Sequence, residues 1–298
     1  KITAPRYSYW RSVFRVFFRK RINIVILALF GLILAFTYVY PMLFEYNPFE
    51  NLLNADAKHL LPSRAMELFG HNIHWILGAG ASGQSTFDAV WFGSRISITM
   101  AFICAAINMT VGILVGAMWG FSKKIDLVMT EVYNIIGNVP YILFISVLVL
   151  IFSAGFWTMV FALTVTGWLF IAYFFRTQVI IIRDREYNLA SRCVGTPTRK
   201  IITRNLLPYL VSVIMLRMAL TVPEAIGSEG FITYIGLGLP TSIPSLGRLI
   251  DDGRQLMMSA SLRYQLIFPT VIVSVVTISF YIIGNAFSDA ADPKNHLT

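Results

Sequence analysis

The sequence predicts an all-α, polytopic membrane protein with six transmembrane helices. Two observations support this fold class. Hydrophobic residues make up 56% of the chain and charged residues only 13%, which is about half the charged fraction of a soluble domain. In addition, long uncharged stretches recur, and a helix of roughly 20 apolar residues crosses the ~30 Å hydrocarbon core of a bilayer. These stretches are residues 23–44, 96–122, 132–175 and 264–288.

The individual spans follow from these stretches. Residues 23–44 predict the first transmembrane helix and residues 96–122 the second. Residues 132–175 are long enough for two spans joined by a tight turn near Ala154 and Gly155. Residues 208–226 predict the fifth span, bracketed by Pro208 and Pro223, and residues 264–288 predict the last.

The distribution of basic residues predicts the orientation, because cytoplasmic segments of membrane proteins carry an excess of Lys and Arg. Residues 1–22 contain seven basic residues and no acid, and residues 183–208 contain six basic residues. Residues 45–93 instead contain five acids against Lys58 and Arg64. We therefore expect residues 45–93 to be extracellular, both termini and the tail of residues 289–298 to be cytoplasmic, and the chain to lie in the cell membrane. This topology accounts for the net charge of +9 without a nucleic-acid partner.

The segment before the first span has the pattern of an amphipathic helix. Its apolar residues recur at helical spacing, and Arg11, Arg15 and Arg19 lie on the opposite face. The apolar residues are Trp10, Val13, Phe14, Phe17 and Phe18. We expect residues 1–22 to form a cytoplasmic helix in the membrane interface, with its aromatic side toward the lipid tails. The alternative is a generic positively charged anchor for the first span.

Two motifs inside the spans indicate packing and a break. Gly112, Gly116 and Gly120 repeat every four residues, a spacing that lets two membrane helices approach closely. Gly137-Asn138-Val139-Pro140 interrupts the third span, because proline removes an intrahelical hydrogen bond. The Asn138 side chain can bond the freed backbone groups or line a polar cavity. Residues 228–263 are external by topology, and their Gly- and Pro-rich apolar part is expected to dip into the protein.

Three charged residues, Arg217, Glu224 and Glu229, lie in or at the end of the fifth span. Charges in a membrane are costly and face a polar cavity or one another. They therefore indicate either a translocation pathway for a charged or zwitterionic solute or a structural ion pair, and the sequence favours neither. Arg217 and Glu224 are separated by ~10.5 Å of helical rise, so we expect them to find partners on other helices rather than each other.

Several other functions are excluded or disfavoured. Residues 78–85, GAGASGQS, resemble a phosphate-binding loop, but Gln84 replaces its lysine and the segment is predicted to be extracellular. His71 and His74 lack further ligands at metal-binding spacing. No arrangement of catalytic side chains stands out. We therefore expect neither an enzyme nor a chain that binds a cofactor or metal itself.

The basic loop of residues 183–208 is predicted to form two short helices at an angle. Residues 186–194 are compatible with a helix, and Gly195 can adopt the positive φ of a helix end. Thr196 is expected to cap the next helix, with Pro197 in its first turn. Such an elbow presents side chains to a partner protein.

Residues 73–293 resemble the inner-membrane permease subunits of peptide-type ABC importers, specifically oligopeptide permease C and its relatives for dipeptides and nickel. The basic loop resembles that superfamily's EAA motif, E-A-A-x3-G-x9-I-x-L-P. Ala190, Gly195, Leu207 and Pro208 match the motif, whereas Leu189, Ser191 and Asn205 replace its Glu, Ala and Ile. Further stretches that carry the resemblance are FGSRIS, REYNLASR, FITYIGLGLP, PSLGRLI and the terminal SDAADP.

The resemblance implies a type I ABC importer permease fold, with residues 94–288 as a core of five spans and the EAA loop. It implies a homologous permease B subunit, two ATPases (the D and F subunits) that bind ATP and Mg, and an extracellular solute-binding protein that delivers peptide. The short helix of the loop would be the coupling helix that sits in a groove of one ATPase. The residues expected to serve this coupling are Glu186, Leu189, Ala190, Ser191, Arg192, Gly195, Thr196, Arg199 and Pro208.

Two other function classes compete with this hypothesis. A secondary transporter predicts inverted repeats and a carboxylate cluster for the coupled ion, and neither is evident in the sequence. A membrane scaffold would not need the elbow around Gly195. Among importers of this class, dipeptide or nickel uptake is the alternative to oligopeptide uptake. We expect Asn138, Arg217, Glu224 and Glu229 to line the pathway if these charges serve transport.

Overall fold

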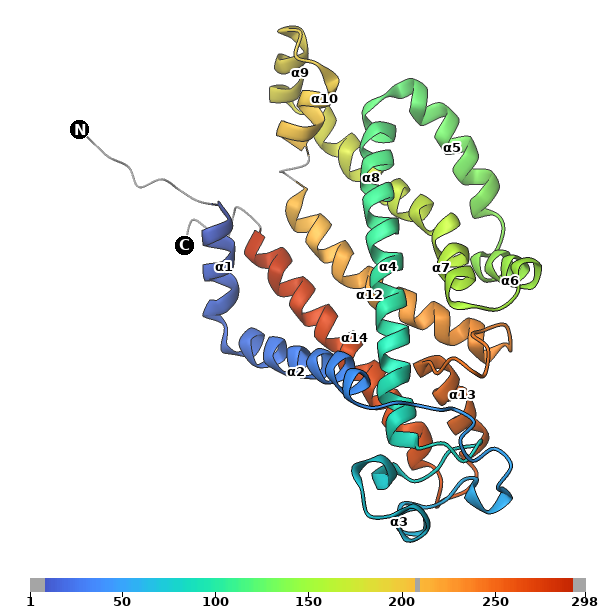
Figure 1. The fold of residues 1–298 in the computed structure, drawn as a ribbon. Helices are drawn as coiled ribbons and strands as arrows, with labels where there is room; N and C mark the ends of the chain where they lie inside the picture. Colours follow the sequence, from blue (N-terminus) through green and yellow to red (C-terminus); the bar gives the residue numbers. More distant parts are fainter. Residues whose placement is uncertain (1–8, 207–209, 292–298) are drawn as a thin grey trace.

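The computed structural model describes residues 9–206 and 210–291, and the regular elements in those ranges are helices (Figure 1). The helices before the central bundle are α1 (Tyr9–Arg19), α2 (Arg21–Leu43), η1 (Ala55–Ala57), α3 (Pro62–Phe69) and η2 (Ile73–Leu77). Those of the bundle and its loops are α4 (Thr86–Phe121), α5 (Lys123–Gly137), α6 (Tyr141–Phe152), α7 (Phe156–Val165), α8 (Gly167–Arg183), α9 (Glu186–Cys193), α10 (Thr198–Ile201), η3 (Ile202–Leu206), α12 (Val211–Tyr234), α13 (Leu246–Gln255) and α14 (Tyr264–Ala291).

Five of the described helical segments are long and apolar enough to cross a membrane: α2, α4, the α7–α8 pair, α12 and α14. The α5–α6 pair supplies a sixth if it is counted as one span bent by 76°. The bend lies at the predicted Gly137–Pro140 break, and the predicted turn near Gly155 separates α6 from α7. The predicted all-α membrane fold is therefore confirmed.

Helix α4 is the central element, and it begins earlier than predicted. Its 36 residues correspond to ~54 Å of rise, so its first turns project beyond a ~30 Å hydrocarbon core. Ser85 determines the start, because its hydroxyl accepts a hydrogen bond from the backbone N–H of Asp88. The second span was predicted to begin at residue 96, with residues 45–93 external, because charged and polar residues before residue 96 interrupt the apolar run.

The three spaced glycines of α4 face α8. A Cβ atom on Gly116 would collide with the carbonyl oxygen of Ala172, and one on Gly120 would lie 2.6 Å from the carbonyl oxygen of Arg176. A Cβ on Gly112 would overlap the Ile171 side chain in the same way. These short distances show that the two helix backbones are in close contact along the glycine face.

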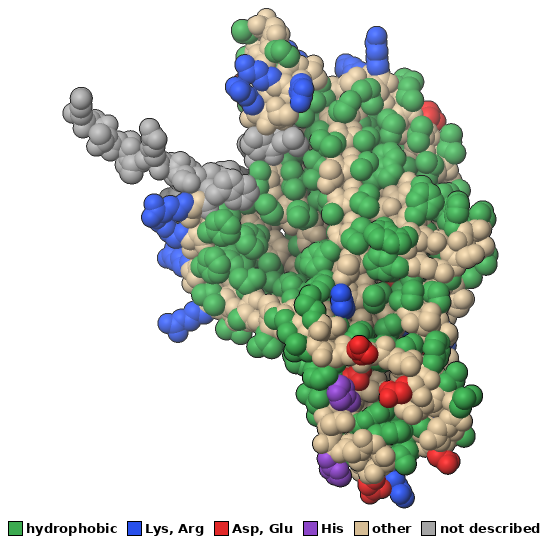
Figure 2. Space-filling view, viewed as in Figure 1, with side chains coloured by type: hydrophobic (Ala, Val, Ile, Leu, Met, Phe, Trp, Pro, Cys, Tyr) green, Lys and Arg blue, Asp and Glu red, His purple; other side chains and the backbone are tan. Residues whose placement is uncertain are grey.

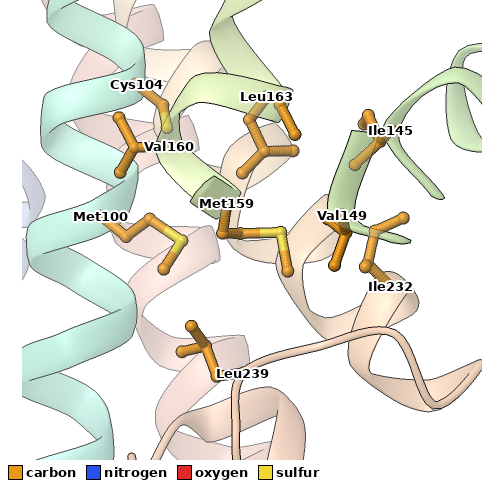
Figure 3. Close-up of a cluster of buried hydrophobic side chains, with 10 residues drawn as sticks. Met100, Cys104, Ile145, Val149, Met159, Val160, Leu163, Ile232 and Leu239 are labelled. Carbon is orange, nitrogen blue, oxygen red and sulfur yellow. The ribbon is translucent and has the colours of Figure 1, made fainter. Parts of the chain in front are cut away.

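A buried apolar cluster joins α4 to α6, α7 and α12 (Figure 3). Figure 3 shows Met100 and Cys104 of α4 meeting side chains of α6, α7 and α12. Leu239, from the segment between α12 and α13, also packs here and is only 3% exposed. This apolar segment therefore dips into the protein, as its composition predicts.

Helix α12 is longer than the predicted fifth span and runs to Tyr234 with Pro223 in its interior. Proline was expected to end the span, but membrane helices tolerate it where neighbouring helices and side chains compensate for the lost hydrogen bond. Helices α4 and α14 pack along α12. Pro208, the other proline expected to bracket this span, lies outside the described residues.

The amphipathic helix α1 forms as predicted, but part of its apolar face packs on protein. Val13 and Phe17 are each 1% exposed, and the Phe17 ring stacks on Phe287 of α14 at 4.0 Å. Phe14 and Phe18 remain exposed. The prediction that the whole aromatic side faces lipid is therefore wrong, because the end of α14 covers one edge of it. The Trp10 side chain lies outside the described set.

Charge separates along the long axis of the molecule (Figure 2). Basic side chains gather near α1, α9 and α10, whereas acidic and histidine side chains gather near α3, at the opposite end. The surface between the two ends is largely hydrophobic in this view. This pattern is typical of a chain whose middle lies in a bilayer.

Candidate functional site

The α9–α10 elbow stands at one end of the helix bundle (Figure 1). Helix α9 ends at Cys193, and Gly195, two residues further on, has a φ of +78°. The backbone N–H of Thr196 donates to the carbonyl of Ser191 (3.0 Å), and that of Gly195 donates to the carbonyl of Arg192 (2.9 Å). These two bonds form a Schellman motif. A Cβ on Gly195 would meet nothing within 4 Å, so glycine is needed here for its backbone conformation and not for space.

Thr196 does not cap the next helix. Helix α10 begins at Thr198 and the residue before it is Pro197, whose carbonyl accepts the N–H groups of Lys200 (2.9 Å) and Ile201 (3.2 Å). The prediction from the sequence was one residue early, since Pro197 and not Thr196 directly precedes α10. Proline serves before α10 because its fixed φ of −58° suits the extended approach to a helix.

One face of α9 is exposed in the part of the chain that the structure describes. Glu186, Leu189 and Ala190 are exposed, as are Tyr187 and Val194. Val194 is 86% exposed, which is unusual for an apolar residue at a polar end of the molecule. Ser191 is half-buried, and its hydroxyl donates to the carbonyl of Tyr187. Arg199 is exposed on α10, and Pro208 lies outside the described residues.

The opposite face of α9 is tied to the bundle by polar side chains. Asn188 is fully buried, and its amide donates to the carbonyl of Ile182 at the end of α8 (3.0 Å). Arg183 donates to the carbonyl of Gly120 (2.9 Å), one of the α4 carbonyls left without an intrahelical partner. The Arg192 guanidinium lies 4.4 Å from the centre of the Phe121 ring. The elbow is therefore joined to the ends of both α4 and α8.

Arg192, one of the residues expected to serve coupling, is exposed and places its guanidinium over the Phe121 ring. A cation over an aromatic ring is stabilised by the negative face of the ring. The supporting residues Asn188, Arg183 and Phe121 were not predicted from the sequence. Arg185, Ser191 and Arg192 lie three and four positions from Asn188, so no apolar pattern marked Asn188 as buried. The Arg183 guanidinium also holds the pKa of Asp184 below its ordinary value by hydrogen bonding.

A cavity of about 520 Å³ lies between α4, α6, α8 and α12. Apolar side chains form most of its wall. Its polar lining residues include Asn108, Tyr141, Arg217, Thr221, Glu224 and Ser228. Arg217 and Glu224 form a two-pronged ion pair, with Nη1 to Oε1 at 2.8 Å and Nη2 to Oε2 at 3.1 Å. The Glu224 side chain is 53% exposed, whereas that of Arg217 is 24% exposed.

The direct Arg217–Glu224 pair contradicts the sequence expectation of partners on other helices. Residues seven apart lie on the same face of a helix, and the two long side chains extend toward each other along it. Their combined length spans the ~10.5 Å of helical rise between the two residues. The pair lies at the cavity wall, so the ion pair and the lining of a cavity are not exclusive alternatives.

Glu229 and Asn138 do not reach this cavity. Glu229 is 1% exposed and accepts hydrogen bonds from three hydroxyl groups: Ser97 (3.0 Å), Ser245 (2.8 Å) and Thr233 (3.1 Å). Asn138 is exposed at the α5–α6 bend, where its amide donates to the carbonyl of Asn134. The structure therefore places Glu229 in a structural polar cluster and gives Asn138 the alternative role of satisfying freed backbone groups.

The loop of residues 78–85 forms a tight turn before α4. The N–H of Gly80 donates to the carbonyl of Gln84 (2.8 Å), and the Gln84 side-chain oxygen accepts the N–H of Ser82 (2.7 Å). The residue that replaces the lysine of a phosphate-binding loop is therefore folded back onto its own backbone. Among the residues that the structure describes, no group of three or more His, Cys, Asp or Glu side chains is placed to hold a metal ion.

Residues 108–296 match the family model of the binding-protein-dependent transport system inner membrane component. The chain belongs to this family of transport permeases. Residues 8–62 match a second model, the N-terminal transmembrane domain of oligopeptide transport permease C. The family resemblance inferred from the EAA-like loop is thus confirmed. The matched ranges include the first span, the elbow and all but one of the residues that line the cavity, so this permease carries its family features across most of its length.

Curated relatives align with the permease over nearly its whole length. The oligopeptide transport system permease protein AmiD of Streptococcus pneumoniae is 41% identical over 99% of this chain and 93% of its own. The oligopeptide permease protein OppC of Bacillus subtilis is 31% identical over 99% of this chain and 92% of its own. The dipeptide permease protein DppC of Bacillus subtilis is 35% identical over 74% of this chain and 69% of its own.

A solved structure shares the fold of the permease. The methionine ABC transporter MetNI in an inward-facing conformation superposes with a TM-score of 0.55 at 18% sequence identity. The match covers 68% of this chain and 97% of the other. The permease is therefore a multi-pass membrane protein with the fold of a type I ABC importer subunit.

Proposed function

We propose that this permease is the membrane subunit through which an ATP-driven importer takes up oligopeptides, and that α9 is its coupling helix. The observation that carries the proposal is the exposed apolar and charged face of α9 on an elbow tied to α4 and α8. An element that is free on one side and anchored on the other can pass a partner's movement to the bundle. The bundle helices are the elements that must rearrange between inward- and outward-open states.

The complete transporter would contain four kinds of partner besides the lipid bilayer. We infer a homologous second permease, two ATPase subunits that bind ATP and Mg, an extracellular solute-binding protein and the peptide itself. This chain would hydrolyse no ATP. The docking residues for an ATPase groove would be the exposed Glu186, Leu189 and Ala190, with Tyr187 and Val194 beside them. Arg192 would act by positioning α9 rather than by contacting the ATPase.

The cavity beside the Arg217–Glu224 pair would form part of the translocation pathway. A peptide is zwitterionic, and a solvated ion pair on a mostly apolar wall offers both signs of charge to its termini. The oligopeptide permeases among the relatives support this substrate class. The 35% identity to a dipeptide permease makes dipeptides the second candidate, and nickel uptake remains the further alternative within the class.

We infer that α1, α9 and α10 lie on the cytoplasmic side and residues 45–93 on the extracellular side. The concentration of basic side chains at the α9–α10 end supports this orientation. Ala81 is exposed in the turn before α4. Cysteine at Ala81, in a chain lacking Cys104 and Cys193, should react with an impermeant maleimide added to intact cells. Reaction only after permeabilisation would reverse the assigned orientation.

The coupling proposal is tested by a matched pair of glycine variants in the assembled transporter. Gly195 and Gly236 have φ values of +78° and +82°, and a Cβ on either meets nothing within 4 Å. The two lie at different ends of the bundle, so Gly195→Val and Gly236→Val impose similar local strain in different places. Peptide uptake and ATP hydrolysis are measured together in proteoliposomes, with a tetrapeptide and a dipeptide as substrates.

We expect Gly195→Val to lose peptide uptake per ATP hydrolysed and Gly236→Val to keep that ratio. Ala190→Trp, which blocks close docking of α9 without changing its backbone, should behave like Gly195→Val. Equal ratios in all variants and in the unmodified transporter would contradict the coupling role of α9. Uptake of neither peptide by the unmodified transporter would contradict the substrate assignment.

A further inference from the structure

A second cavity of about 520 Å³ lies at the end of the bundle opposite the elbow. Its walls come from the ends of α2, α4 and α7 and from the segment before α13. Four of the ten lining residues are aromatic, and one, Arg95, is charged. The aromatic lining residues are Tyr38, Tyr46, Phe92 and Phe156. A volume of this size falls within the range of small-molecule sites, ~300–1,000 Å³.

Arg95 has no ion pair, hydrogen bond or ring contact with another residue in the described parts of the chain. Two carboxylates close to this region already have partners of their own. Asp88 and Asp252 are the two that act on Tyr46, where burial and their negative charges raise its pKa above the ordinary value. Asp88 is bonded to His74 (2.9 Å) and to Tyr40, and Asp252 pairs with Arg248 (3.4 Å). The positive charge of Arg95 is therefore uncompensated within the described chain.

The depth of the cavity fits the headgroup region of a bilayer. Arg95 and Phe121 are separated on α4 by ~39 Å of rise, and Lys123 and Lys124 follow directly after Phe121. An average tilt of about 20° reduces this rise only to ~37 Å, which still exceeds the ~30 Å hydrocarbon core. Tyr38, near the end of α2, and the Tyr46–Phe92 ring pair (5.1 Å) surround Arg95. Tyrosine is enriched at this depth.

We propose that this cavity binds the headgroup of a net-negative membrane phospholipid, with the Arg95 guanidinium contacting its phosphate. Arginine matches phosphate geometry through two parallel hydrogen bonds. The aromatic walls suit the glycerol and first acyl carbons, because their rings are apolar at the face and polar at the edge. The hydroxyl of Tyr38 is held by Thr99 at 3.0 Å, so this part of the wall is already ordered. The site is independent of which solute the permease conducts.

The test uses the assembled transporter purified in detergent, with thermal unfolding as the readout. Phosphatidylglycerol should raise the unfolding midpoint more than phosphatidylcholine with the same acyl chains. This difference should be lost in Arg95→Gln and kept in Arg64→Gln, a matched control whose arginine pairs with Glu67 on α3. Inorganic phosphate at the same concentration should have no effect. An equal response to phosphatidylglycerol in both variants, or a full response to inorganic phosphate, would overturn the proposal.

A second measurement uses only the unmodified transporter and needs no variant. Phosphatidylglycerol with a photoreactive diazirine in its headgroup is crosslinked to the unmodified transporter, and the modified residues are mapped by peptide mass spectrometry. Crosslinks at Tyr46, Phe92 or Arg95 are the expected result. Crosslinks confined to other parts of this chain would contradict the site, even if Arg95→Gln fails to assemble.

Discussion

The cluster around Glu229 allows a sharp prediction for the substitution Ser97→Ala. The Ser97 hydroxyl donates to Glu229 (3.0 Å) and accepts the backbone N–H of Leu246 (3.0 Å). It thereby joins α4 to α12 and to the start of α13. All three groups are buried, since Ser97 and Glu229 are each 1% exposed and Leu246 is 0% exposed.

The expected loss of stability follows from two lost hydrogen bonds, which leave the Glu229 carboxylate and the Leu246 N–H each without one buried partner. A buried hydrogen bond contributes about 1–1.5 kcal/mol net, and leaving a buried partner unsatisfied moves the cost toward the upper end. Ser97→Ala should therefore lower the free energy of unfolding by about 3 kcal/mol. The matched control is Ser94→Ala, which makes the same change one turn away. The Ser94 hydroxyl bonds only the carbonyl of Val90 in its own helix, so its loss should cost under ~1 kcal/mol.

The assay exploits the two cysteines of the chain. Cys104 is fully buried and Cys193 is exposed, so a Cys193→Ala background leaves Cys104 as a reporter of unfolding. Thiol labelling of Cys104 in the assembled transporter is quantified by peptide mass during a temperature ramp. A difference of about 2 kcal/mol between the variants corresponds to ~4–8 °C in midpoint for domains of 150–250 residues. Midpoints within about 1 °C of each other would refute the reasoning that Ser97 ties three elements together.

Three further predictions concern packing, coupling and the pathway. Gly116→Ala should reduce the yield of folded permease, because the added Cβ would collide with the Ala172 carbonyl oxygen. The control Gly31→Ala, whose Cβ would meet nothing within 4 Å, should leave the yield unchanged. Equal yields of the two variants would contradict the close contact between α4 and α8. Asn188→Ala should lower peptide uptake per ATP hydrolysed at unchanged assembly, since it frees one anchor of α9, and an unaltered ratio would contradict its positioning role. Arg217→Gln should slow peptide uptake with little loss of complex, because half-exposed Glu224 stays solvated; impaired assembly with normal uptake per complex would instead favour a purely structural pair.

The sequence by itself determined the membrane fold, the spans and the family. Uncharged stretches of bilayer length and the placement of Lys and Arg are one-dimensional signals, because the bilayer imposes length and charge constraints directly on the chain. The helix end at Gly195 was also predictable, since a positive φ strongly favours glycine. The break at Gly137–Pro140 followed in the same way from the missing N–H of proline.

Only the tertiary structure decided what the polar residues inside these elements do. Arg192 could have faced outward, but Phe121 lies within reach of it. Glu229 and Glu224 are five residues apart on one helix, yet the first is enclosed by three hydroxyl groups and the second faces a cavity. Arg95 lines a cavity and forms no ion pair within the described residues, whereas Asp88 and Asp252 pair with His74 and Arg248. A side chain's partner is set by the distances between helices that are remote in sequence, and the residue pattern along a single helix does not encode those distances.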